Sequence, residues 1–401
     1  MRLAVVSPFV DRQHGTERAF AELLERLARN YECEIHLYAQ RVEDLALAGG
    51  DLTRPSGVGR IIWHRVPPIP GPHLLQFTGW FYLNRLWRWA DRFFRRTSFD
   101  LVLSPGINCN DADVIVVHAL FHRLEELAQE HREEPQEQSF FRRHHRRLYY
   151  RFLTRLERHI YSDPKVALAT VSQRTAHLIT QYFQRQDVRV IPNAVDMSEF
   201  SPSARFARRA EARRHWNFRE EDFVLLLIGN DWRAKGLYTL LEAMAALSDL
   251  PVQLLVVGSE PQQYFSARAK ELGVQTRCHW ELPRRDVLDF YAAADVYASP
   301  SYEDSFGLPV AEAMACGLPV ITSTCAGVAE WIHDGVDGFV LPKASDAQAL
   351  ASLIRRIFQQ QELRARLGEA GAHAAANWTW DNNAESAWRF LQESLARRQQ
   401  S

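Results

Sequence analysis

The sequence predicts an α/β protein with two domains, each built on a parallel β-sheet. Its 401 residues are 46% hydrophobic, and a chain of this length usually divides its core between two domains. Short apolar, β-branched segments alternate with longer segments of helical periodicity through both halves of the chain. Strands that alternate with helices form parallel sheets covered on both faces. Two such series in succession therefore indicate two Rossmann-like domains.

The expected strands are short and apolar. Those of the first half lie in the segments RLAVVSP, CEIHLYA, GRIIWHRV, LVLSP, VIVVH, ALATVS and VRVIPN, and those of the second half in FVLLLIGN, VQLLVVGS, VYASPS, LPVITS and GFVLP. A proline-bounded turn, IPNAVDMSEFSP, separates the two series. We therefore expect domains at residues 1–202 and 203–378, with residues 379–401 forming a helix that returns to the first domain. Because ligands bind beyond the carboxyl ends of parallel strands, one cleft between the two sheets is the expected site of the chemistry.

The composition excludes several classes of protein. With 48 Lys and Arg against 49 Asp and Glu, the chain is nearly neutral, which argues against a nucleic-acid-binding protein. No segment has the roughly eighteen consecutive apolar residues of a membrane-spanning helix, and the opening MRLAVVSPFV indicates a strand rather than a signal peptide. The cysteines are far apart without C-x-x-C spacing, which predicts neither disulfides nor zinc and fits a cytoplasmic location. They are Cys33, Cys109, Cys278, Cys316 and Cys325.

The segment GLPVAEAMACG predicts a helix that begins near Pro309, with Gly307 in the turn before it. The N-terminus of this helix would present backbone N–H groups to an anion. Glu312 would lie in the first turn, where its carboxylate can accept two hydrogen bonds from the vicinal diol of a ribose. The simpler alternative is a glutamate that only caps the helix.

Further candidates follow other strands. Arg233 and Lys235 precede Gly236 at the expected start of a helix, and together they suit a diphosphate, although solvated loop charges would give the same pattern. His118 ends the run VIVVH, so it is either a substrate contact or an ordinary strand-end histidine. The first βα turn carries Gly15 without a G-x-G-x-x-G pattern, which argues against an NAD-dependent enzyme.

Metal binding is not predicted. Asp111 and Asp113 in the segment DAD match a D-x-D metal motif, but they read more simply as turn residues beside a strand. We expect no catalytic metal and no cofactor.

The motifs taken together resemble the signature of the retaining, family-4 glycosyltransferases of GT-B fold. In SPSYEDSFGLPVAEAMACGLPVITS, an acidic pair with seven residues between its members lies beside FGLP and EAMA. The resemblance continues through GTER, IPNAVDMSEF, IGNDWRAKG, LLVVGSEP, DFYAAADVYASPS, AGVAEWIHDGVDGFVLP and NWTWDN, and so covers essentially the whole chain. The middle of the first domain and GNDWRAKG are most similar to the bacterial lipopolysaccharide core glucosyltransferases. The implied fold is GT-B, with two Rossmann-like domains whose parallel sheets face each other across a cleft.

The resemblance also implies roles for single residues. Glu312 would hold the ribose of a UDP-, GDP- or ADP-sugar donor, and Arg233 and Lys235 would hold its diphosphate. Asp304, which precedes Glu312 at the family's spacing where Glu303 does not, would contact the sugar hydroxyls. The remaining contacts implied are His118 near the transferred sugar and Gly15, Phe306, Gly307 and Leu308 in the donor site.

Two positions depart from the family pattern. His14 stands where a second glycine is usual, and Asn230 stands where many members carry arginine, which leaves Arg233 as the one guanidinium on the diphosphate. The implied reaction is metal-independent transfer of a hexose, with retention, to a lipid- or glycan-linked hydroxyl in cell-envelope polysaccharide or lipopolysaccharide synthesis. A sugar-nucleotide epimerase or phosphorylase-like enzyme of similar architecture, and an inactive subunit that binds a partner transferase, remain as alternatives.

Two arginine-rich segments predict amphipathic helices. Either helix could pack its apolar face on the sheet and leave its arginines in solvent, or the surface could dock on anionic lipid at the inner face of the cell membrane. The expected arginine faces are Arg85, Arg88, Arg92 and Arg95 in the first helix and Arg147, Arg151, Arg155 and Arg158 in the second. The expected apolar faces are Leu83, Leu86, Trp87, Ala90 and Phe94 in the first and Tyr149, Phe152, Leu153, Leu156 and Ile160 in the second.

Overall fold

The computed structural model describes residues 1–12, 15–47, 59–94, 97–130, 140–284 and 286–400, with the side chains of 130 and 140–146 left out of the description. The chain divides into two compact units, Met1–Pro192 with Trp380–Ser401, and Asn193–Thr379. We call them unit 1 and unit 2. The boundaries expected from the sequence, after residues 202 and 378, fall ten residues after the first division and one residue before the second.

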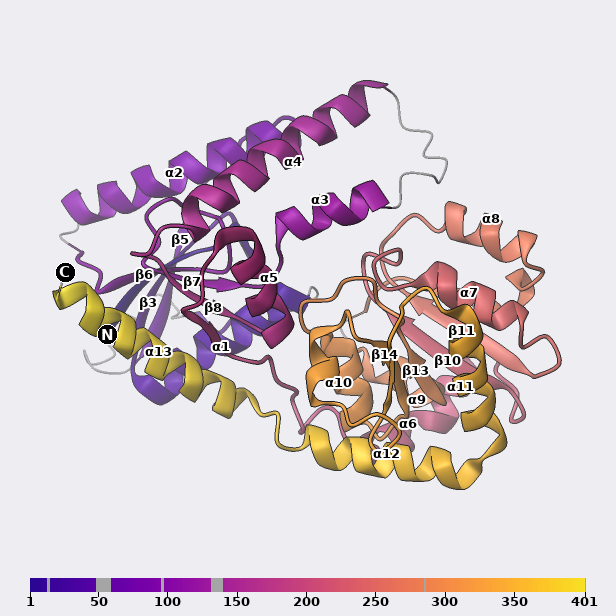
Figure 1. The fold of residues 1–401 in the computed structure, drawn as a ribbon. Helices are drawn as coiled ribbons and strands as arrows, with labels where there is room; N and C mark the ends of the chain where they lie inside the picture. The colour runs from indigo at the N-terminus through magenta and orange to yellow at the C-terminus, as the bar shows by residue number, and fades with distance from the viewer. Residues whose placement is uncertain (13–14, 48–58, 95–96, 131–139, 285, 401) are drawn as a thin grey trace. The chain divides into compact units, whose positions relative to one another are not determined.

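The described part of unit 1 contains a seven-stranded sheet in the order β5-β3-β1-β6-β7-β8-β9, and its neighbouring strands are parallel (Figure 1). The strands are β1 Arg2–Val6, β3 Glu34–Ala39, β5 Arg60–Arg65, β6 Leu101–Ser104, β7 Val114–Val117, β8 Ala167–Thr170 and β9 Val188–Val190. Two further short strands, β2 Phe9–Val10 and β4 Arg41–Val42, follow β1 and β3 in the sequence and pair with each other in parallel.

Helices cover both faces of this sheet because successive residues of a strand point to opposite sides. Leu3 and Val5 of β1 pack in one cluster with α1 and α13, whereas Ala4 and Val6 pack in another with α2, α4 and α5. The rings of Tyr31 and Trp388 stack between α1 and α13 at 5.1 Å. The helices of unit 1 are α1 Gly15–Tyr31, α2 His73–Phe94, α3 Phe121–Glu130, α4 Phe140–Tyr161, α5 Gln173–Phe183 and α13 Trp380–Gln400.

Unit 2 repeats the design with a sheet in the order β12-β11-β10-β13-β14-β15, again parallel. Its strands are β10 Phe223–Ile228, β11 Val252–Val257, β12 Cys278–Glu281, β13 Val296–Ala298, β14 Val320–Ser323 and β15 Phe339–Leu341. Its α-helices are α6 Pro202–His215, α7 Leu237–Ala245, α8 Gln263–Glu271, α9 Leu288–Ala293, α10 Leu308–Ala315, α11 Ala347–Gln359 and α12 Gln361–Ala375. The edge strand β12 is not expected from the sequence because CHWE mixes polar and aromatic residues, all only half-buried.

Helix α2 follows the predicted faces only in part: Arg85 and Arg92 are exposed and Leu83 packs on the core, as expected, but other positions differ. Its expected arginine face includes Arg88, which is buried, while Leu86, Trp87 and Phe94 of the expected apolar face are exposed. The reason is that the inward polar groups have partners: Arg88 forms an ion pair with Asp111 at 2.7 Å. Arg95 lies outside the described residues. The buried residues of α2 are Trp80, Phe81, Asn84, Arg88 and Asp91.

Helix α4 follows the expectation. Tyr149, Phe152 and Leu156 pack against the core cluster around Leu153 and Ile160. The expected arginines of this helix, Arg147, Arg151, Arg155 and Arg158, are exposed. No helix in the described part of the chain is long and apolar enough to cross a membrane.

Candidate functional site

The candidate site of unit 2 lies where the strand order of its sheet reverses, between β10 and β13. In open parallel sheets, ligands bind outside the carboxyl ends of the strands at such a switch point. The loop after β10 carries Arg233 and Lys235 and ends at Gly236, the N-cap of α7. The loop after β13 carries Asp304 and ends at Gly307, the N-cap of α10. The topology therefore brings two sequence-predicted loops to one edge of the sheet.

Lys235 and Asp304 meet at this edge. The lysine Nζ donates to Asp304 Oδ2, and the two side chains are only 16% and 13% exposed. Water screens the attraction between two such buried charges only weakly, so each charge holds the other in place. The neighbouring acid, Glu303, is positioned by its backbone N–H, which donates to the Ala234 carbonyl at 3.3 Å. Asp304 is thus the acid of the two that pairs with the lysine.

Backbone hydrogen bonds fix the loop that carries Asp304. Its N–H donates to the Cys325 carbonyl at 3.1 Å, and its carbonyl accepts from the Gly327 N–H at 2.8 Å. The buried ring of Phe306 lies 5.7 Å from the ring of Trp331, at the end of a 3₁₀ turn over Gly327–Trp331. The backbone of Asp304 is therefore held by hydrogen bonds on both sides, as in a β-strand, which limits the freedom of its side chain.

Both helices at this edge begin at a glycine that no other residue could easily replace. Gly236 has φ +79°, and a Cβ on it would lie 2.1 Å from the Pro300 carbonyl oxygen. Gly307 has φ +100°, and its Cβ would lie 3.0 Å from Val328 Cγ1. Neither N-cap has a side chain to cap the first turn. The N–H groups and the dipoles of α7 and α10 are therefore directed at the loops that carry Lys235 and Asp304.

The prediction that Glu312 lies in the first turn of its helix is wrong. Since Gly307 caps the helix and Leu308 is its first residue, Glu312 comes one turn later, too far along to cap the N-terminus. The carboxylate is buried, and Oε2 accepts a hydrogen bond of 2.6 Å from the Tyr291 hydroxyl on α9. Tyr291 orients this carboxylate, but its sequence context, DFYAAADVYASPS, indicates only a buried helix and gives no sign of the contact.

Arg233 and Asn230 lie on the same loop with different surroundings. The Arg233 guanidinium lies over the ring of Tyr238, 5.6 Å from its centroid. Asn230 Oδ1 accepts from the Ser259 N–H at 3.3 Å and from the Ser259 hydroxyl at 3.1 Å. Asn230 therefore links the ends of β10 and β11, which gives the departure from the family pattern a structural role.

The remaining predicted residues belong to unit 1. His118 directly follows β7 and is half-buried, and this burial lowers the pKa of its imidazole to about 4. The ring is therefore neutral at pH 7. Gly15 is the first residue of α1, while His14 lies outside the described residues.

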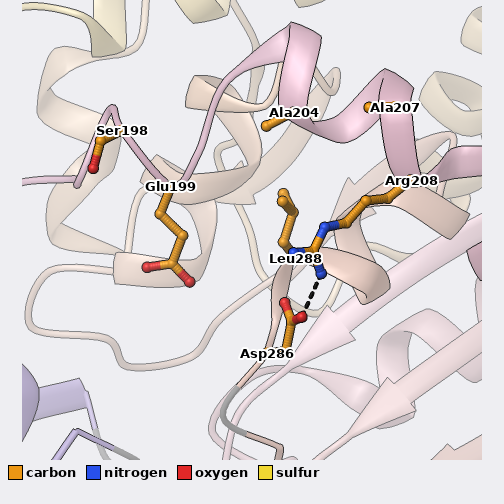
Figure 2. Close-up of a pocket in the computed structure, with 7 residues that line it drawn as sticks. All are labelled: Ser198, Glu199, Ala204, Ala207, Arg208, Asp286 and Leu288. Carbon is orange, nitrogen blue, oxygen red and sulfur yellow. Dashed lines mark hydrogen bonds and ion pairs between the residues drawn. The ribbon is translucent and has the colours of Figure 1, made fainter.

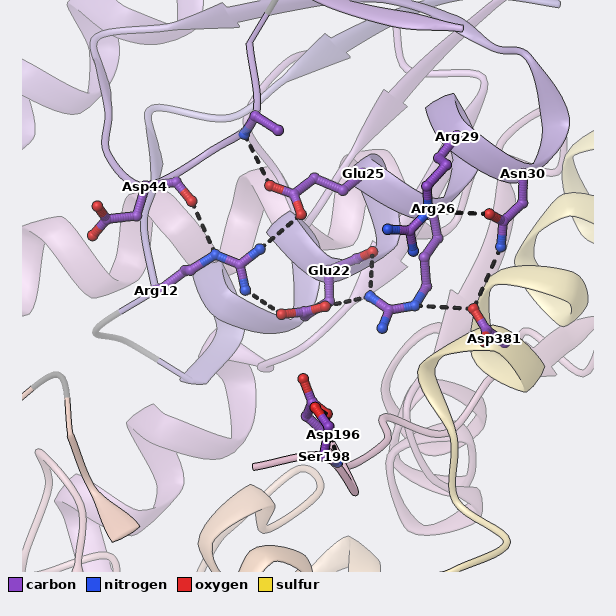
Figure 3. Close-up of polar contacts among 11 residues, drawn as sticks. Arg12, Glu22, Glu25, Arg26, Arg29, Asn30, Asp44, Asp196, Ser198 and Asp381 are labelled. Carbon is purple, nitrogen blue, oxygen red and sulfur yellow. Dashed lines mark hydrogen bonds and ion pairs between the residues drawn. The ribbon is translucent and has the colours of Figure 1, made fainter. Parts of the chain in front are cut away.

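An ion-pair network joins Arg12 to helix α1 (Figure 3). Arg12 pairs with Glu22 and, at 2.8 Å, with Glu25, both on α1. Glu22 also pairs with Arg26, whose Nε lies 3.2 Å from Asp381 at the start of α13. No local pattern in the sequence indicates this network, which positions Arg12 and joins α1 to α13.

The two aspartates of the DAD segment are engaged by arginines. Asp111 pairs with Arg88, and Asp113 Oδ2 accepts from the Val102 N–H at 2.8 Å and from Arg398 at 2.7 Å. These contacts agree with the simpler interpretation of the segment. Among the described residues, no group of three His, Cys, Asp or Glu side chains is placed to hold a metal ion.

A pocket of about 550 Å³ also lies in unit 2, where α6 meets the segment before α9 (Figure 2). Arg208 points across it toward Asp286, with which it forms an ion pair, and also contacts Asp289 at 3.1 Å. None of the sequence-predicted site residues lines this pocket, so it is separate from the switch point. Its lining consists of Ser198, Glu199, Ala204, Ala207, Arg208, Asp286 and Leu288.

Two parallel sheets covered by helices, with cations and glycine-capped helices at a switch point, are typical of Rossmann-like α/β proteins. Two family models match the chain: "Glycosyltransferase Family 4" over residues 14–199 and "Glycosyl transferases group 1" over residues 208–374. The chain belongs to the family-4 glycosyltransferases of GT-B fold.

Similar proteins include curated enzymes and solved structures. The lipopolysaccharide glucosyltransferase WaaG of Escherichia coli (strain K12) is 33% identical over 160 residues, which cover 39% of this chain and 43% of that protein. A D-inositol 3-phosphate glycosyltransferase of Thermobifida fusca (strain YX) is 30% identical over 243 residues, 57% of this chain and 55% of that protein. The chain thus spans about half the length of the curated relatives it matches.

Solved structures confirm the predicted fold class. The crystal structure of WaaG has a TM-score of 0.75 at 23% identity and covers 96% of this chain and 98% of that chain. Sucrose-phosphate synthase from Thermosynechococcus elongatus has a TM-score of 0.74 at 22% identity, with 99% and 100% covered. At these identities the similarity shows the fold alone.

Proposed function

We propose that the protein is a retaining glycosyltransferase that moves a hexose from a nucleoside-diphosphate sugar to a hydroxyl of a lipid- or glycan-linked acceptor. The observation that supports this most is the meeting of Lys235 and Asp304 at the switch point, between two helices that begin at glycines. A nucleoside diphosphate leaves as an anion, so fixed cations and helix N-termini stabilise the charge that develops on it.

The comparisons support the classes of donor and acceptor. One relative is a lipopolysaccharide glucosyltransferase and another is a D-inositol 3-phosphate glycosyltransferase. A solved neighbour, HepE of Anabaena, has been crystallised with UDP-glucose, with a TM-score of 0.66 at 18% identity. We accordingly expect a UDP-, GDP- or ADP-sugar as donor.

In this proposal each residue of unit 2 has a distinct task. Lys235 and Arg233 bind the diphosphate, and we assign the positive charge there to them and to the N-termini of α7 and α10 rather than to a metal ion. Asp304 holds Lys235 in place and accepts hydrogen bonds from sugar hydroxyls. Glu312, oriented by Tyr291, accepts from the ribose diol. The backbone of Phe306, Gly307 and Leu308 completes the donor contacts.

In unit 1, Gly15 would allow close approach of the backbone to the phosphates. His118 would contact the transferred sugar. Because its imidazole is neutral at pH 7, it can donate or accept one hydrogen bond there without adding a second cation to the oxocarbenium-like sugar. The acceptor hydroxyl would then attack the face from which the diphosphate leaves, which retains the anomeric configuration.

We place the reaction on the cytoplasmic side of the cell membrane, in the synthesis of cell-envelope polysaccharide or lipopolysaccharide. The similarity to the lipopolysaccharide glucosyltransferase supports this setting. All five cysteines, each in the described part of the chain, are free thiols, as is usual in a reducing compartment.

A donor screen followed by a transfer assay tests the proposal. Thermal shift against UDP-, GDP- and ADP-sugars should single out one nucleotide, because a ligand at 100 times its Kd adds about 2.7 kcal/mol to the free energy of unfolding. NMR of the product formed with a lipid- or glycan-linked acceptor should then show the donor's anomeric configuration. Epimerised donor without acceptor would indicate an epimerase, and tight donor binding without transfer to any acceptor would indicate an inactive subunit; either result overturns the proposal.

A further inference from the structure

Two histidines are buried in direct contact at the edge of the unit 1 sheet. His36 lies on β3 and His64 on β5, the outermost strand beside it. Their side chains are only 8% and 7% exposed, and His36 Nδ1 lies 2.9 Å from His64 Nε2. Neither ring has a task in the transfer reaction proposed above.

A carboxylate lies at each outer end of this pair. His36 Nε2 is 2.9 Å from Glu34 Oε1, and His64 Nδ1 is 2.8 Å from Asp91 Oδ2 on α2. Burial raises the pKa of Glu34, but the adjacent imidazole and two arginines lower it to about 2, so this carboxylate is ionised at pH 7. Asp91 Oδ2 accepts a second contact, from the Tyr38 hydroxyl at 2.9 Å. Both oxygens therefore face the imidazoles as acceptors. The two arginines are Arg2 on β1 and Arg60 on β5.

This chain of contacts needs one more proton than two neutral imidazoles carry. A ring nitrogen that faces an acceptor oxygen at 2.8 or 2.9 Å must bear a proton, because two lone pairs at that distance repel. With Nε2 of His36 and Nδ1 of His64 protonated, each neutral ring has used its one proton. The two inner nitrogens would then present lone pairs to each other across 2.9 Å. A third proton between them removes this repulsion and gives the pair one positive charge.

We propose that His36 and His64 share one proton and form a cationic clasp that holds α2 against β3 and β5 in a pH-dependent way. The charge of the clasp lies between Glu34 at one end and Asp91 of α2 at the other, so both carboxylates stabilise it. When a rise in pH removes the proton, the two inner lone pairs face each other and α2 loosens from the strands. The proposal concerns unit 1 alone and does not depend on the donor chemistry proposed for unit 2.

The surrounding charges determine how firmly this proton is held. Burial lowers the pKa of His36, Glu34 raises it, and the two arginines lower it again. The contact with His64 reverses the balance, because rings in contact titrate as a pair. The pair holds its first proton more tightly than a free imidazole of pKa about 6.5, and a second proton less tightly. Arg88, the other buried charge of α2 in the described residues, pairs with Asp111 instead. The charged and titratable groups that face the pair in this part of the chain are Arg2, Glu34, Tyr38, Arg60 and Asp91.

Opening of α2 should depend on pH in a way that identifies the shared proton. From pH 6.5 to pH 8 the clasp keeps its proton, whereas the two histidines of the opened segment lose theirs above a pKa of about 6.5. The equilibrium constant for opening should therefore rise about tenfold over this range. In His64→Gln the amide N–H can donate to His36 Nδ1 without a titrating charge, so its opening constant should not rise.

Hydrogen exchange of the full chain measures this opening, by mass spectrometry of α2 peptides with correction for the intrinsic exchange rate at each pH. His177→Gln, at an exposed position of α5, is the matched control and should keep the wild-type pH dependence. In the wild-type protein, a constant that does not rise from pH 6.5 to pH 8 would overturn the proposal. The same holds if His64→Gln retains the wild-type rise.

NMR of ¹⁵N-histidine-labelled protein locates the protons directly. At pH 7.5 we expect protons on three of the four ring nitrogens of His36 and His64, one for each contact in the chain. The signals are assigned by their loss in His36→Gln and His64→Gln. Protons on only two of these nitrogens would mean that the pair is neutral, and the shared proton would be refuted.

Discussion

Replacing Asp304 by asparagine removes one charge from the switch point of unit 2 while it preserves the shape of the side chain. In the structure this carboxylate receives the Lys235 ammonium, and both side chains are largely shielded from water. Asparagine can still accept a hydrogen bond but carries no charge. The lysine would then lose the partner that fixes its position, and a bound sugar would lose an anionic acceptor.

The size of the effect follows from this geometry. Loss of one preorganised charged contact costs about 10²–10³-fold in rate, or about 2.7–4 kcal/mol. Exposed ion pairs contribute about 0–1 kcal/mol to stability, and breaking a fully buried one costs about 3–5 kcal/mol. A pair that is 16% and 13% exposed lies between these limits, so we expect about 1–2 kcal/mol of lost stability. Asp304→Asn should therefore stay folded while kcat/KM falls by about 10²-fold or more.

The assay compares initial rates of donor consumption for Asp304→Asn with those for the adjacent control, Glu303→Gln, which also removes one charge. The control should lose far less activity, because the family's spacing and the contact with Lys235 both select Asp304. Lys235→Met and the Lys235→Met/Asp304→Asn double variant complete a cycle. If the two side chains act as a unit, the double variant should be little worse than the worse single variant.

If Glu303→Gln lowered kcat/KM more than Asp304→Asn, the assignment of Asp304 to the sugar from its spacing to Glu312 would be refuted. Strict additivity in the cycle would contradict a joint role for the ion pair. The assignment of Glu312 to the ribose is independent of both results, because it depends on α10 and Tyr291.

Three further predictions concern metal, backbone and pH. Activity should survive EDTA, because cationic side chains and helix N-termini supply the charge; complete loss that added metal restores would contradict this. Gly236→Ala should lower the free energy of unfolding, measured by urea denaturation, by about 2 kcal/mol or more, because of strain at positive φ and the clash with Pro300. The control Gly273→Ala, at φ +69° with open space around the new Cβ, should cost only about 1 kcal/mol. Equal losses would refute the clash. The pKa of His118 is about 4 in the folded protein and about 6.5 in the unfolded chain, so between these pH values only the unfolded chain binds the proton. The free energy of unfolding should therefore fall as the pH drops from 6.5 toward 4, by about 2 kcal/mol between pH 7 and pH 5. A His118→Asn variant with the same pH dependence would contradict it.

The sequence predicts the backbone of this protein better than the surroundings of its side chains. Apolar, β-branched runs identify the central strands because burial on both faces demands them. The edge strand β12 lacks that pattern, since its residues are only half-buried. The positions of Lys235 and Asp304 were predictable because each follows a strand whose carboxyl end must lie at one edge. The direct ion pair between Lys235 and Asp304 was not predictable, because it depends on the conformations of the two loops.

Helix α2 shows why face assignments from periodicity can fail. The helical periodicity of α2 indicates an arginine face and an apolar face, and the apolar face of an amphipathic helix usually packs against the core. Here Asp111 and His64, both distant along the chain, provide partners for Arg88 and Asp91, so these two polar residues are buried while Arg85 and Arg92 stay exposed. The contact of Tyr291 with Glu312 and the ion pairs of Arg12 are not predictable from the sequence for the same reason. Contacts between distant elements leave no local period in the sequence.

The ion pair at the switch point suggests how one exchange could serve two steps of the proposed reaction. Before the donor binds, Asp304 neutralises Lys235 and keeps the ammonium at the edge of the sheet. A diphosphate carries more negative charge than a carboxylate and, in the proposed site, would also face the N-termini of α7 and α10, so it would compete for the lysine. As Lys235 turns to the phosphates, Asp304 is released to accept hydrogen bonds from the sugar. The same carboxylate thus orients the cation before binding and the sugar afterwards, which is why removing its charge should affect catalysis more than stability.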